Sequence, residues 1–393
     1  IKYSIRMETS ARPGKATISL EAIKHNFRSI MQGLPPITSA CAAVKANAYG
    51  HGAIQAGHAL LAAGADMLGV ASAAEGIELR QNGLQCPILI FGPFFPCEAE
   101  EIARFQLTPF IADRERLKPL SQAAAKTGTT VKVFLKIDTG MGRVGCDPAD
   151  APALALAIHS SAGLQLAGTA THLAAADTAD PAYTRQQLAT FQQAINGIRE
   201  NGMDPGIISA GNSGATITAT ETALFDLVRP GISLYGYFPS HEVPRELSLL
   251  PAMTFESAVS FIKKVPAGTH ISYGMTYTTK KPTTIATIPI GYADGWPRSL
   301  SNRGTVWING SRYPIAGKIC MDQFMIDLGL NSNVSLYDRV VLFGPPQGER
   351  FEVQPATAED IADICGTIPY EITCGISGRI PRVYQEADQK QVK

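Results

Sequence analysis

Short apolar runs alternate with alanine-rich amphipathic segments along the first 240 residues. The runs are rich in β-branched and small apolar residues, which is typical of buried strands, and the segments between them have helical periodicity. We predict strands at 41–46, 67–72, 88–92, 108–111, 131–137, 166–171, 207–210 and 227–234. Eight strands that alternate with helices over about 220 residues suit a (β/α)₈ barrel of the TIM type, whose usual length is about 250 residues.

A doubly wound open sheet is the competing fold for this pattern. That fold places a Gly-x-Gly-x-x-Gly turn after its first strand when it binds a dinucleotide. No such turn follows the first predicted strand here, so the barrel is favoured.

The pattern changes after about residue 240. Period-two runs rich in threonine replace the alternating pattern, at 283–290, 305–308 and 340–343, and 358–366 reads as one short helix. Asn309-Gly310 is a hairpin signal. We therefore expect an α/β chain with a C-terminal mostly-β domain, divided into an extension at 1–16 that can add a strand to that domain, the barrel at 17–240 and the β domain at 241–393.

Composition narrows the classes of partner. The 393 residues carry 34 basic and 34 acidic side chains, so nothing in the net charge suggests nucleic acid or an anionic membrane. The apolar runs are shorter than the roughly 20 residues that span a bilayer. Seven cysteines without metal-site spacing indicate reduced thiols, no metal and a cytoplasmic protein. Because the first residue is Ile1, a removed signal or membrane domain stays open.

Polar residues follow the predicted strands where a barrel would place its chemistry. Catalytic groups in such barrels lie at the C-terminal ends of strands and in the loops after them. Lys45, Arg143, His172, Ser213 and Arg229 all fall at that face. Lys45 ends the first strand, and a lysine amine in apolar surroundings can form a Schiff base. The competing interpretation is a lysine that reaches out to solvent.

The segment 43–52, Ala-Val-Lys-Ala-Asn-Ala-Tyr-Gly-His-Gly, resembles the pyridoxal-phosphate lysine segment of the alanine racemase family. Further blocks match in the family's order, from about residue 17 to 384: 136–143 (KIDTGMGR), 171–172 (TH), 211–213 (GNS), 229–232 (RPGI), 272–274 (SYG), 291–295 (GYADG) and 320–323 (CMDQ). Chance does not explain so many matches in the family's order.

The resemblance implies pyridoxal 5'-phosphate as the cofactor, bound to Lys45. It implies phosphate contacts from the loops after the seventh and eighth strands and from the turn after Lys45, with the residues Tyr49, Asn212, Ser213, Gly231 and Ile232. It also implies that Arg229 contacts the pyridine nitrogen and that His172 supports Arg229. An arginine stays protonated and does not protonate the ring, so proton return would depend on well-placed bases.

The resemblance further implies a two-base racemisation of L- and D-alanine for peptidoglycan. Lys45 and Tyr273 would act on opposite faces of Cα, with Tyr273 supplied by the other subunit of a homodimer. On its own, Tyr273 reads as an interface or packing residue.

Substrate contacts follow from the same resemblance. Arg143 would pair with the substrate carboxylate, and Lys136 would carry a carbamate that orients Arg143. Met321 would offer its backbone amide to the carboxylate, and Tyr292 would line the entrance.

One departure from the family pattern leaves alternatives open. Gly378 stands where the family usually has a tyrosine beside the substrate, which suggests either weaker cofactor binding or a serine or broad-specificity racemase. A decarboxylase of basic amino acids shares the barrel-plus-β plan, and a cofactor carrier related to single-barrel proteins is a non-enzymatic alternative. The presence of Tyr273 and Arg229, and the additional β domain, argue against both.

Overall fold

The computed structural model describes residues 12–218, 225–346 and 352–385. The chain divides into two compact units. One runs from Leu20 to Leu250, and the other joins the segment that ends at Ser19 to the chain from Pro251 onward. No described helix is long and apolar enough to cross a membrane.

The first unit is a closed parallel barrel whose strands follow one another in chain order, which excludes the doubly wound sheet. The strands are β2 (Ser39–Ala43), β3 (Met67–Val70), β4 (Ile88–Ile90), β5 (Thr108–Ile111), β6 (Val131–Lys136), β7 (Leu164–Ala170), β8 (Ile207–Ser209) and β9 (Leu227–Val228). All eight predicted strands are present. Pairing of Ser39 with Leu227 closes the ring between β2 and β9.

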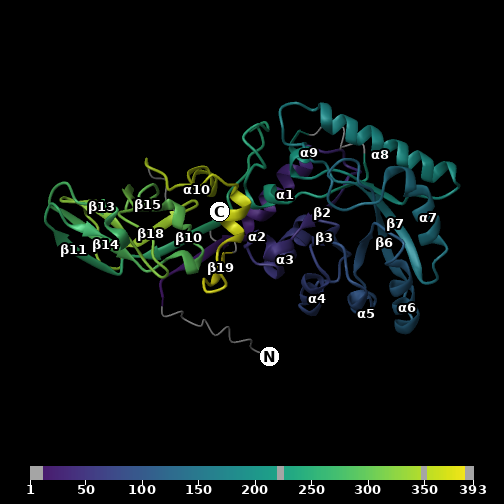
Figure 1. Cartoon of the computed structure of the whole chain (residues 1–393), viewed down its shortest axis with the longest axis horizontal. Helices are drawn as coiled ribbons and strands as arrows, with labels where there is room; N and C mark the ends of the chain where they lie inside the picture. The colour runs from purple at the N-terminus through teal and green to yellow at the C-terminus, as the bar shows by residue number, and fades with distance from the viewer. Residues whose placement is uncertain (1–11, 219–224, 347–351, 386–393) are drawn as a thin grey trace, which may run out of the picture. The chain divides into compact units, whose positions relative to one another are not determined.

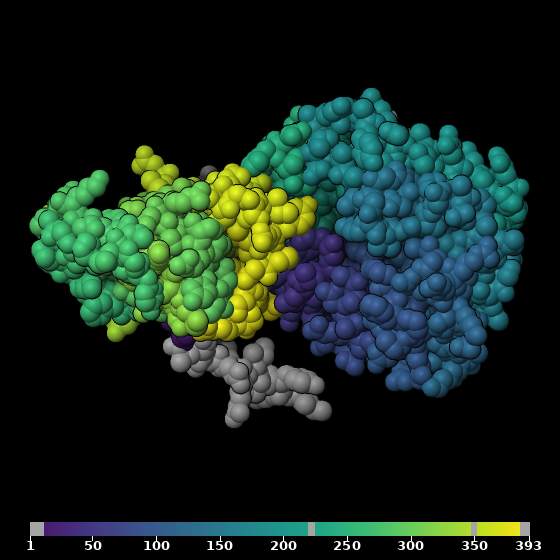
Figure 2. Space-filling view, viewed as in Figure 1, coloured from purple at the N-terminus to yellow at the C-terminus, as the bar shows by residue number. Residues whose placement is uncertain are grey.

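Helices lie outside the ring of strands (Figure 1). They are α1 (Leu20–Gln32), α2 (Lys45–Tyr49), α3 (Ala53–Ala63), α4 (Ala73–Gln81), α5 (Ala99–Arg104), α6 (Leu117–Thr127), α7 (Ala151–His159), α8 (Ala182–Glu200) and α9 (Ser213–Thr218). The longer helices, such as α6 and α8, bury an apolar face. In the space-filling view the blue to teal segments pack as one body (Figure 2). Glycine ends several of them, as at Gly64 and Gly128, where a left-handed residue closes the last turn.

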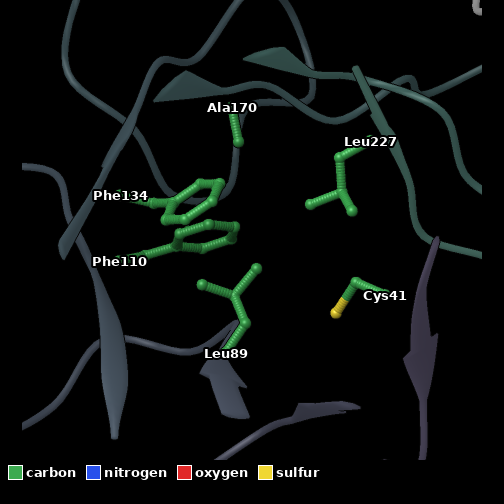
Figure 3. Packing of buried hydrophobic residues seen from close by; sticks show 6 residues of the cluster. All are labelled: Cys41, Leu89, Phe110, Phe134, Ala170 and Leu227. Carbon is green, nitrogen blue, oxygen red and sulfur yellow. The ribbon is translucent and has the colours of Figure 1, made fainter. Parts of the chain in front are cut away.

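The barrel interior is filled by side chains from different strands that face one another (Figure 3). The cluster comprises Cys41, Leu89, Phe110, Phe134, Ala170 and Leu227. The rings of Phe110 and Phe134 are 6.3 Å apart, centroid to centroid. Small residues leave room for these rings: a Cβ on Gly168 would lie 2.4 Å from Phe134 Cε1. This packing makes the barrel a solid support for the loops at its rim.

The second unit is mostly β, as predicted. Its strands are β1 (Lys15–Ser19), β10 (Met253–Ala258), β11 (Phe261–Val265), β12 (His270–Ile271), β13 (Tyr277–Thr278), β14 (Thr283–Ile288), β15 (Thr305–Ile308), β16 (Ser311–Pro314), β17 (Phe324–Gly329), β18 (Arg339–Phe343) and β19 (Arg382–Gln385). Within the described residues of this unit, the strands are accompanied by the α-helices α10 (Ala358–Cys365) and α11 (Pro369–Cys374). Asn309 and Gly310 both have positive φ and join β15 to β16 in the expected hairpin.

The main sheet of this unit combines the two ends of the described chain. Its order is β16-β15-β18-β10-β1-β19, so β1 lies between β10 and β19. It is antiparallel to β10 and parallel to β19. Figure 2 shows the yellow C-terminal segments packed against green segments of the same unit. Residues 1–11 of the predicted N-terminal extension lie outside the described residues.

We expect Phe134→Ala to destabilise the barrel, because Phe134 is fully buried among the facing rings. Removing a buried phenylalanine ring lowers the free energy of unfolding by about 3–5 kcal/mol. Urea denaturation would measure this loss. Leu156→Ala on α7, where Leu156 is 54% exposed, is the control and should change the value by less than about 0.5 kcal/mol. Equal effects of the two substitutions would contradict the solid-core interpretation.

Candidate active site

The segment that carries Lys45 is a left-handed turn. Strand β2 ends at Ala43, so Lys45 does not end the strand as predicted but begins α2. The next four residues, Ala46 to Tyr49, all have φ between 52° and 54°. The left-handed conformation costs each L-residue roughly 1–2 kcal/mol of free energy, so neighbouring groups must hold this turn in place.

Polar contacts brace the turn from several sides. The backbone N–H of Ala46 donates to Glu75 Oε1 at 2.7 Å. Asn47 accepts from Ala53 N through its side chain at 2.8 Å and from Gly52 N through its carbonyl at 2.8 Å. Lys45 Nζ lies 5.9 Å from the centroid of the Tyr49 ring. The turn therefore fixes Lys45 and Tyr49 relative to each other.

A cradle of hydroxyls and backbone amides lies beyond this turn. Gly231 N–H donates to Ser213 Oγ at 2.8 Å, and Ser233 Oγ donates to Ser213 Oγ at 3.2 Å. A Cβ on Gly231 would lie 2.4 Å from Tyr49 Oη, so only glycine keeps the cradle open. Clustered hydroxyls and backbone amides suit the acceptor oxygens of a phosphate group.

The two remaining members of the predicted phosphate set have supporting positions. Ile232 is buried at the start of η4 (Ile232–Tyr235), directly after Gly231. Asn212 Nδ2 donates to Leu173 O at 3.0 Å, and its Oδ1 accepts from Ala215 N at 3.2 Å. Asn212 thus shapes the loop that presents Ser213.

Arg229 is buried behind the cradle, directly after β9. Its guanidinium donates to Thr171 O at 2.7 Å, to Ala210 O at 3.2 Å and to Ser209 Oγ. It also lies 3.3 Å from His172 Nδ1. Burial lowers the pKa of Arg229 to about 10, which still leaves it protonated at neutral pH. The predicted pairing of His172 with Arg229 is therefore present in the structure.

The charge on Arg229 acts on neighbouring groups. Burial, followed by Arg229, lowers the pKa of His172 well below its ordinary value, so the ring is neutral and can accept from Arg229. The same two causes, in the same order, lower the pKa of Lys136 to about 7. Lys136 ends β6, is buried, and donates to Ile137 O at 3.1 Å. A neutral lysine amine is a nucleophile.

Arg143 is exposed on the loop after β6. Asp138 organises this loop by accepting from Gly140 N at 3.0 Å and from Gly142 N at 3.1 Å. The charge of Arg143 contributes to the lowered pKa of both Lys136 and His172. Arg143 is thus near the rim of the same site, with its guanidinium available to a ligand.

The other predicted site residues meet in the β unit. Tyr273, Tyr292 and Met321 line one pocket of about 440 Å³. Their exposed fractions are 73%, 43% and 53%. Tyr292 N–H donates to Cys320 O at 3.1 Å, which joins the 291–295 block to the 320–323 block. The pocket therefore presents large side chains outward from adjoining loops.

The turn that carries Tyr273 is strained as well. Ser272 has φ 68° and ψ −178°, a conformation that is almost confined to glycine, and Met275 also has positive φ. Ser272 Oγ donates to Lys318 O at 2.5 Å. Asn302 Nδ2 donates to Thr276 Oγ1 at 3.1 Å on the other side of the turn. These contacts hold Tyr273 at the surface.

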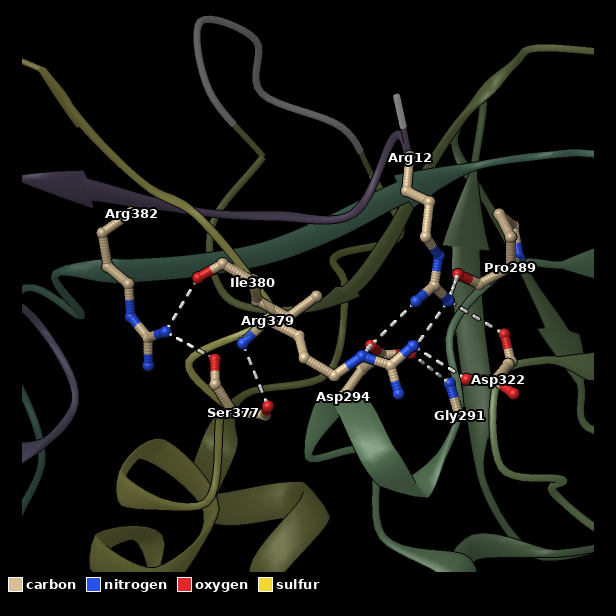
Figure 4. Close-up of polar contacts among 9 residues, drawn as sticks. All are labelled: Arg12, Pro289, Gly291, Asp294, Asp322, Ser377, Arg379, Ile380 and Arg382. Atoms are coloured by element: carbon tan, nitrogen blue, oxygen red, sulfur yellow. Dashed lines mark hydrogen bonds and ion pairs between the residues drawn. The ribbon is translucent and has the colours of Figure 1, made fainter. Parts of the chain in front are cut away.

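Arginine side chains contact the loops that carry Asp294 and Asp322 (Figure 4). The Asp294 carboxylate is fully buried and accepts from both terminal nitrogens of Arg12 at 3.1 and 3.0 Å. Arg12 also donates to Asp322 O at 3.0 Å, while Arg379 donates to Asp322 Oδ1 at 2.8 Å. Arginines from both ends of the chain thereby fix the loops that hold Tyr292 and Met321.

Sequence reasoning missed several supporting residues. Glu75 follows Ser72 by three positions, a spacing that signals a helix start but not a contact with Ala46. Gln187 donates to His172 O at 3.1 Å from α8, and Ser209 accepts from Arg229. Arg12 gave no local signal. Each of these residues acts through a contact with a residue that is distant in the sequence.

Lys136 should give stability a measurable pH dependence. Its pKa is about 7 in the folded protein and 10.5 ordinarily, so the unfolded state binds more protons between these values. The free energy of unfolding of the wild type, minus that of Lys136→Met, should therefore rise with pH between about 7 and 10.5. Urea denaturation from about pH 6 to about pH 10 in buffer free of carbon dioxide measures the difference. Lys132→Met, at an exposed position of β6, is the control, and a difference that falls with pH would refute the assignment.

Comparison with known proteins gives a consistent result over nearly the whole chain. The model "Alanine racemase, N-terminal domain" matches residues 18–239, and "Alanine racemase, C-terminal domain" matches 252–384. The alanine racemases of Halothermothrix orenii and Carboxydothermus hydrogenoformans are 41% and 43% identical over 374 residues, which is 95% of this chain and 97% and 100% of theirs.

Solved structures agree. An alanine racemase of Clostridium difficile 630 superposes with a TM-score of 0.90 at 36% identity, covering 96% of this chain and 97% of its own. One from Bartonella henselae, with covalently bound pyridoxal phosphate, has a TM-score of 0.84 at 32% identity and covers 96% and 100%. Taken with the barrel, the braced lysine turn and the cradle at Gly231, these matches show that the chain belongs to the alanine racemase family and is a pyridoxal-phosphate-dependent enzyme.

Proposed function

We propose that this protein interconverts L- and D-alanine. The observation that carries the proposal is the barrel rim, where Lys45 on its braced turn, the Ser213–Gly231 cradle and the buried Arg229 follow different strands at one face. This arrangement suits a phosphorylated, aromatic cofactor and an amine that binds it. Similarity to an alanine racemase that is 41% identical over 95% of this chain supports the same activity.

The residues of the barrel divide the work of holding pyridoxal phosphate. Lys45 Nζ supplies the covalent attachment. Tyr49, Ser213, Gly231 and Ile232 would contact the phosphate, and Asn212 shapes the loop that presents Ser213. Arg229, which lies beside neutral His172, would donate to the ring nitrogen. The bound cofactor withdraws electrons from Cα of the amino acid and so acidifies its proton.

Racemisation then needs two groups that exchange protons on opposite faces of Cα. Lys45 Nζ is one, and Tyr273 Oη is the other. Because Arg229 retains its proton, it would not protonate the ring nitrogen, and proton return would rest on these two bases. Correct placement of Lys45 and Tyr273 is thus the main requirement on the protein.

Substrate binding falls to residues around these bases. Arg143 pairs with the substrate carboxylate through its planar fork, and the backbone amide of Met321 adds a second contact. Tyr292 borders the entrance. Lys136, whose pKa is about 7, reacts as a free amine with carbon dioxide to give a carbamate and a proton, and the carbamate orients Arg143.

We further propose a homodimer in which each active site takes Lys45 from one subunit and Tyr273 from the other. Tyr273 and Met275 are 73% and 63% exposed on a strained, well-braced turn. Such strain at an exposed aromatic residue indicates a side chain held ready for a partner surface. Apart from the second subunit, a reaction on a small-molecule substrate requires no partner.

Alanine is the substrate that the comparisons favour, and they do not favour a serine or broad-specificity racemase. Gly378 is exposed in a turn where a Cβ would meet no atom within 4 Å, so the fold does not require glycine there. We propose that the product D-alanine supplies peptidoglycan. No disulfide joins any two of the seven cysteines, all of which lie in the described residues, and this supports a reducing cytoplasmic compartment.

Purified wild-type protein with pyridoxal phosphate should racemise alanine from either enantiomer much faster than serine. Lys45→Ala should abolish turnover, and Tyr273→Phe should lower it by about 10²–10⁴-fold, the usual contribution of a general acid or base. Chiral chromatography of the products measures both. Tyr313→Phe, in the same β unit, is the control and should keep full activity. Full activity of Lys45→Ala would refute the proposed function.

Mixing the two impaired variants, Lys45→Ala and Tyr273→Phe, tests the shared site. A dimer of one Lys45→Ala chain and one Tyr273→Phe chain contains one site with both defects and one site with neither. Activity should therefore reappear when the variants are mixed and allowed to exchange subunits. Each variant incubated alone under the same conditions is the control. Continued inactivity of mixed dimers, isolated by two different affinity tags, would show that each chain uses its own pair of bases.

A further inference from the structure

Glu75 contacts two loops of the active-site rim at once. Its Oε1 accepts from Ala46 N at 2.7 Å, and its Oε2 accepts from Ala71 N at 2.7 Å. Ala46 follows Lys45 after β2, and Ala71 follows β3. One carboxylate therefore joins the loops after two adjacent strands of the barrel.

This use of the carboxylate differs from helix capping. Glu75 is the third residue of α4, and its own N–H donates to the cap residue Ser72 at 3.4 Å. In a capping box the glutamate would return the contact to the backbone N–H of the cap. Here both oxygens pass beyond Ser72 to amides outside the helix. The cap and the carboxylate thus have separable roles.

The contact with Ala46 acts at the start of the left-handed turn. Ala46 is the first of four consecutive residues with φ near 52°, and it adjoins Lys45. Each such residue tends to relax toward the right-handed region. A charge-assisted hydrogen bond to the first amide opposes that relaxation where it would move the lysine most.

We propose that Glu75 is a positioning residue that holds Lys45 in the geometry required for cofactor attachment. This inference rests on the proposed role of Lys45. The contacts of Glu75 are with backbone amides and not with the lysine side chain. Its loss should appear as weaker cofactor binding and as greater mobility of the turn.

The test compares Glu75→Gln with Ser72→Ala in the holoenzyme. Glutamine keeps one acceptor oxygen but turns an NH₂ group toward a second N–H, so one of the two contacts is lost. Ser72→Ala removes the cap of the same helix and leaves both carboxylate contacts intact. The two variants therefore separate general destabilisation of α4 from loss of the clamp.

Two quantities are measured: the dissociation constant for pyridoxal phosphate, and the hydrogen exchange rate of the peptides that contain Ala46 and Ala71. Glu75→Gln should raise the dissociation constant about tenfold, as loss of a charged hydrogen bond does, and should speed exchange in both peptides. Ser72→Ala should lower the melting temperature, yet keep the dissociation constant within about twofold. Glu78→Gln, at an exposed position of α4, should change neither quantity.

Unchanged binding and exchange in Glu75→Gln would overturn the proposal. An equal rise in the dissociation constant for Ser72→Ala at equal loss of melting temperature would also overturn it, since the role would then be structural only. Borohydride trapping of the cofactor on Lys45 separates this result from the proposed function. Wild-type protein that traps cofactor at Lys45 without racemising alanine would refute the racemase proposal and leave the Glu75 comparison valid.

Discussion

The positive charge of Arg229, buried at the end of β9, is the constraint on which the site depends. The guanidinium is held by carbonyl and hydroxyl oxygens and by the imidazole of His172. Because these groups are neutral, the charge is not cancelled locally and acts on its surroundings. Burial is the larger cause of the lowered pKa of His172 and of Lys136, and the charge of Arg229 adds to it in both cases. Burial and a single buried cation thus act together to favour the neutral forms of the groups beside Arg229.

The two proposed bases share a structural principle. Lys45 and Tyr273 each belong to a segment with positive φ, and in each case polar side chains brace the backbone next to the base. Glu75 serves the lysine turn, while Ser272 and Asn302 serve the tyrosine turn. Strain of this kind survives only where surrounding contacts determine the conformation. The backbone conformation of each turn therefore positions its base, together with the packing of the side chains.

Regular patterns made the fold predictable, and local irregularity limited the prediction of the site. Buried strands such as β5 and β15 have the predicted ends, because apolar periodicity reports burial directly. Lys45 was placed on a strand because Ala-Val-Lys continues an apolar run, whereas the left-handed turn depends on contacts from Glu75 and Asn47. Arg12 and Gln187 were missed for the same reason. Their contacts join residues far apart in sequence, which no local pattern encodes.

The position of β1 has a consequence for how the protein forms during translation. This strand leaves the ribosome before the barrel, but its neighbours β10 and β19 follow more than two hundred residues later. Domains generally fold as units in the order of synthesis, so the barrel can close while β1 still lacks both partners. An apolar strand with Ala16 and Ile18 thus stays unpaired on the nascent chain until β10 emerges, and one of its edges stays open until β19 follows. Chaperone binding would protect this strand during the interval between its synthesis and its incorporation into the sheet.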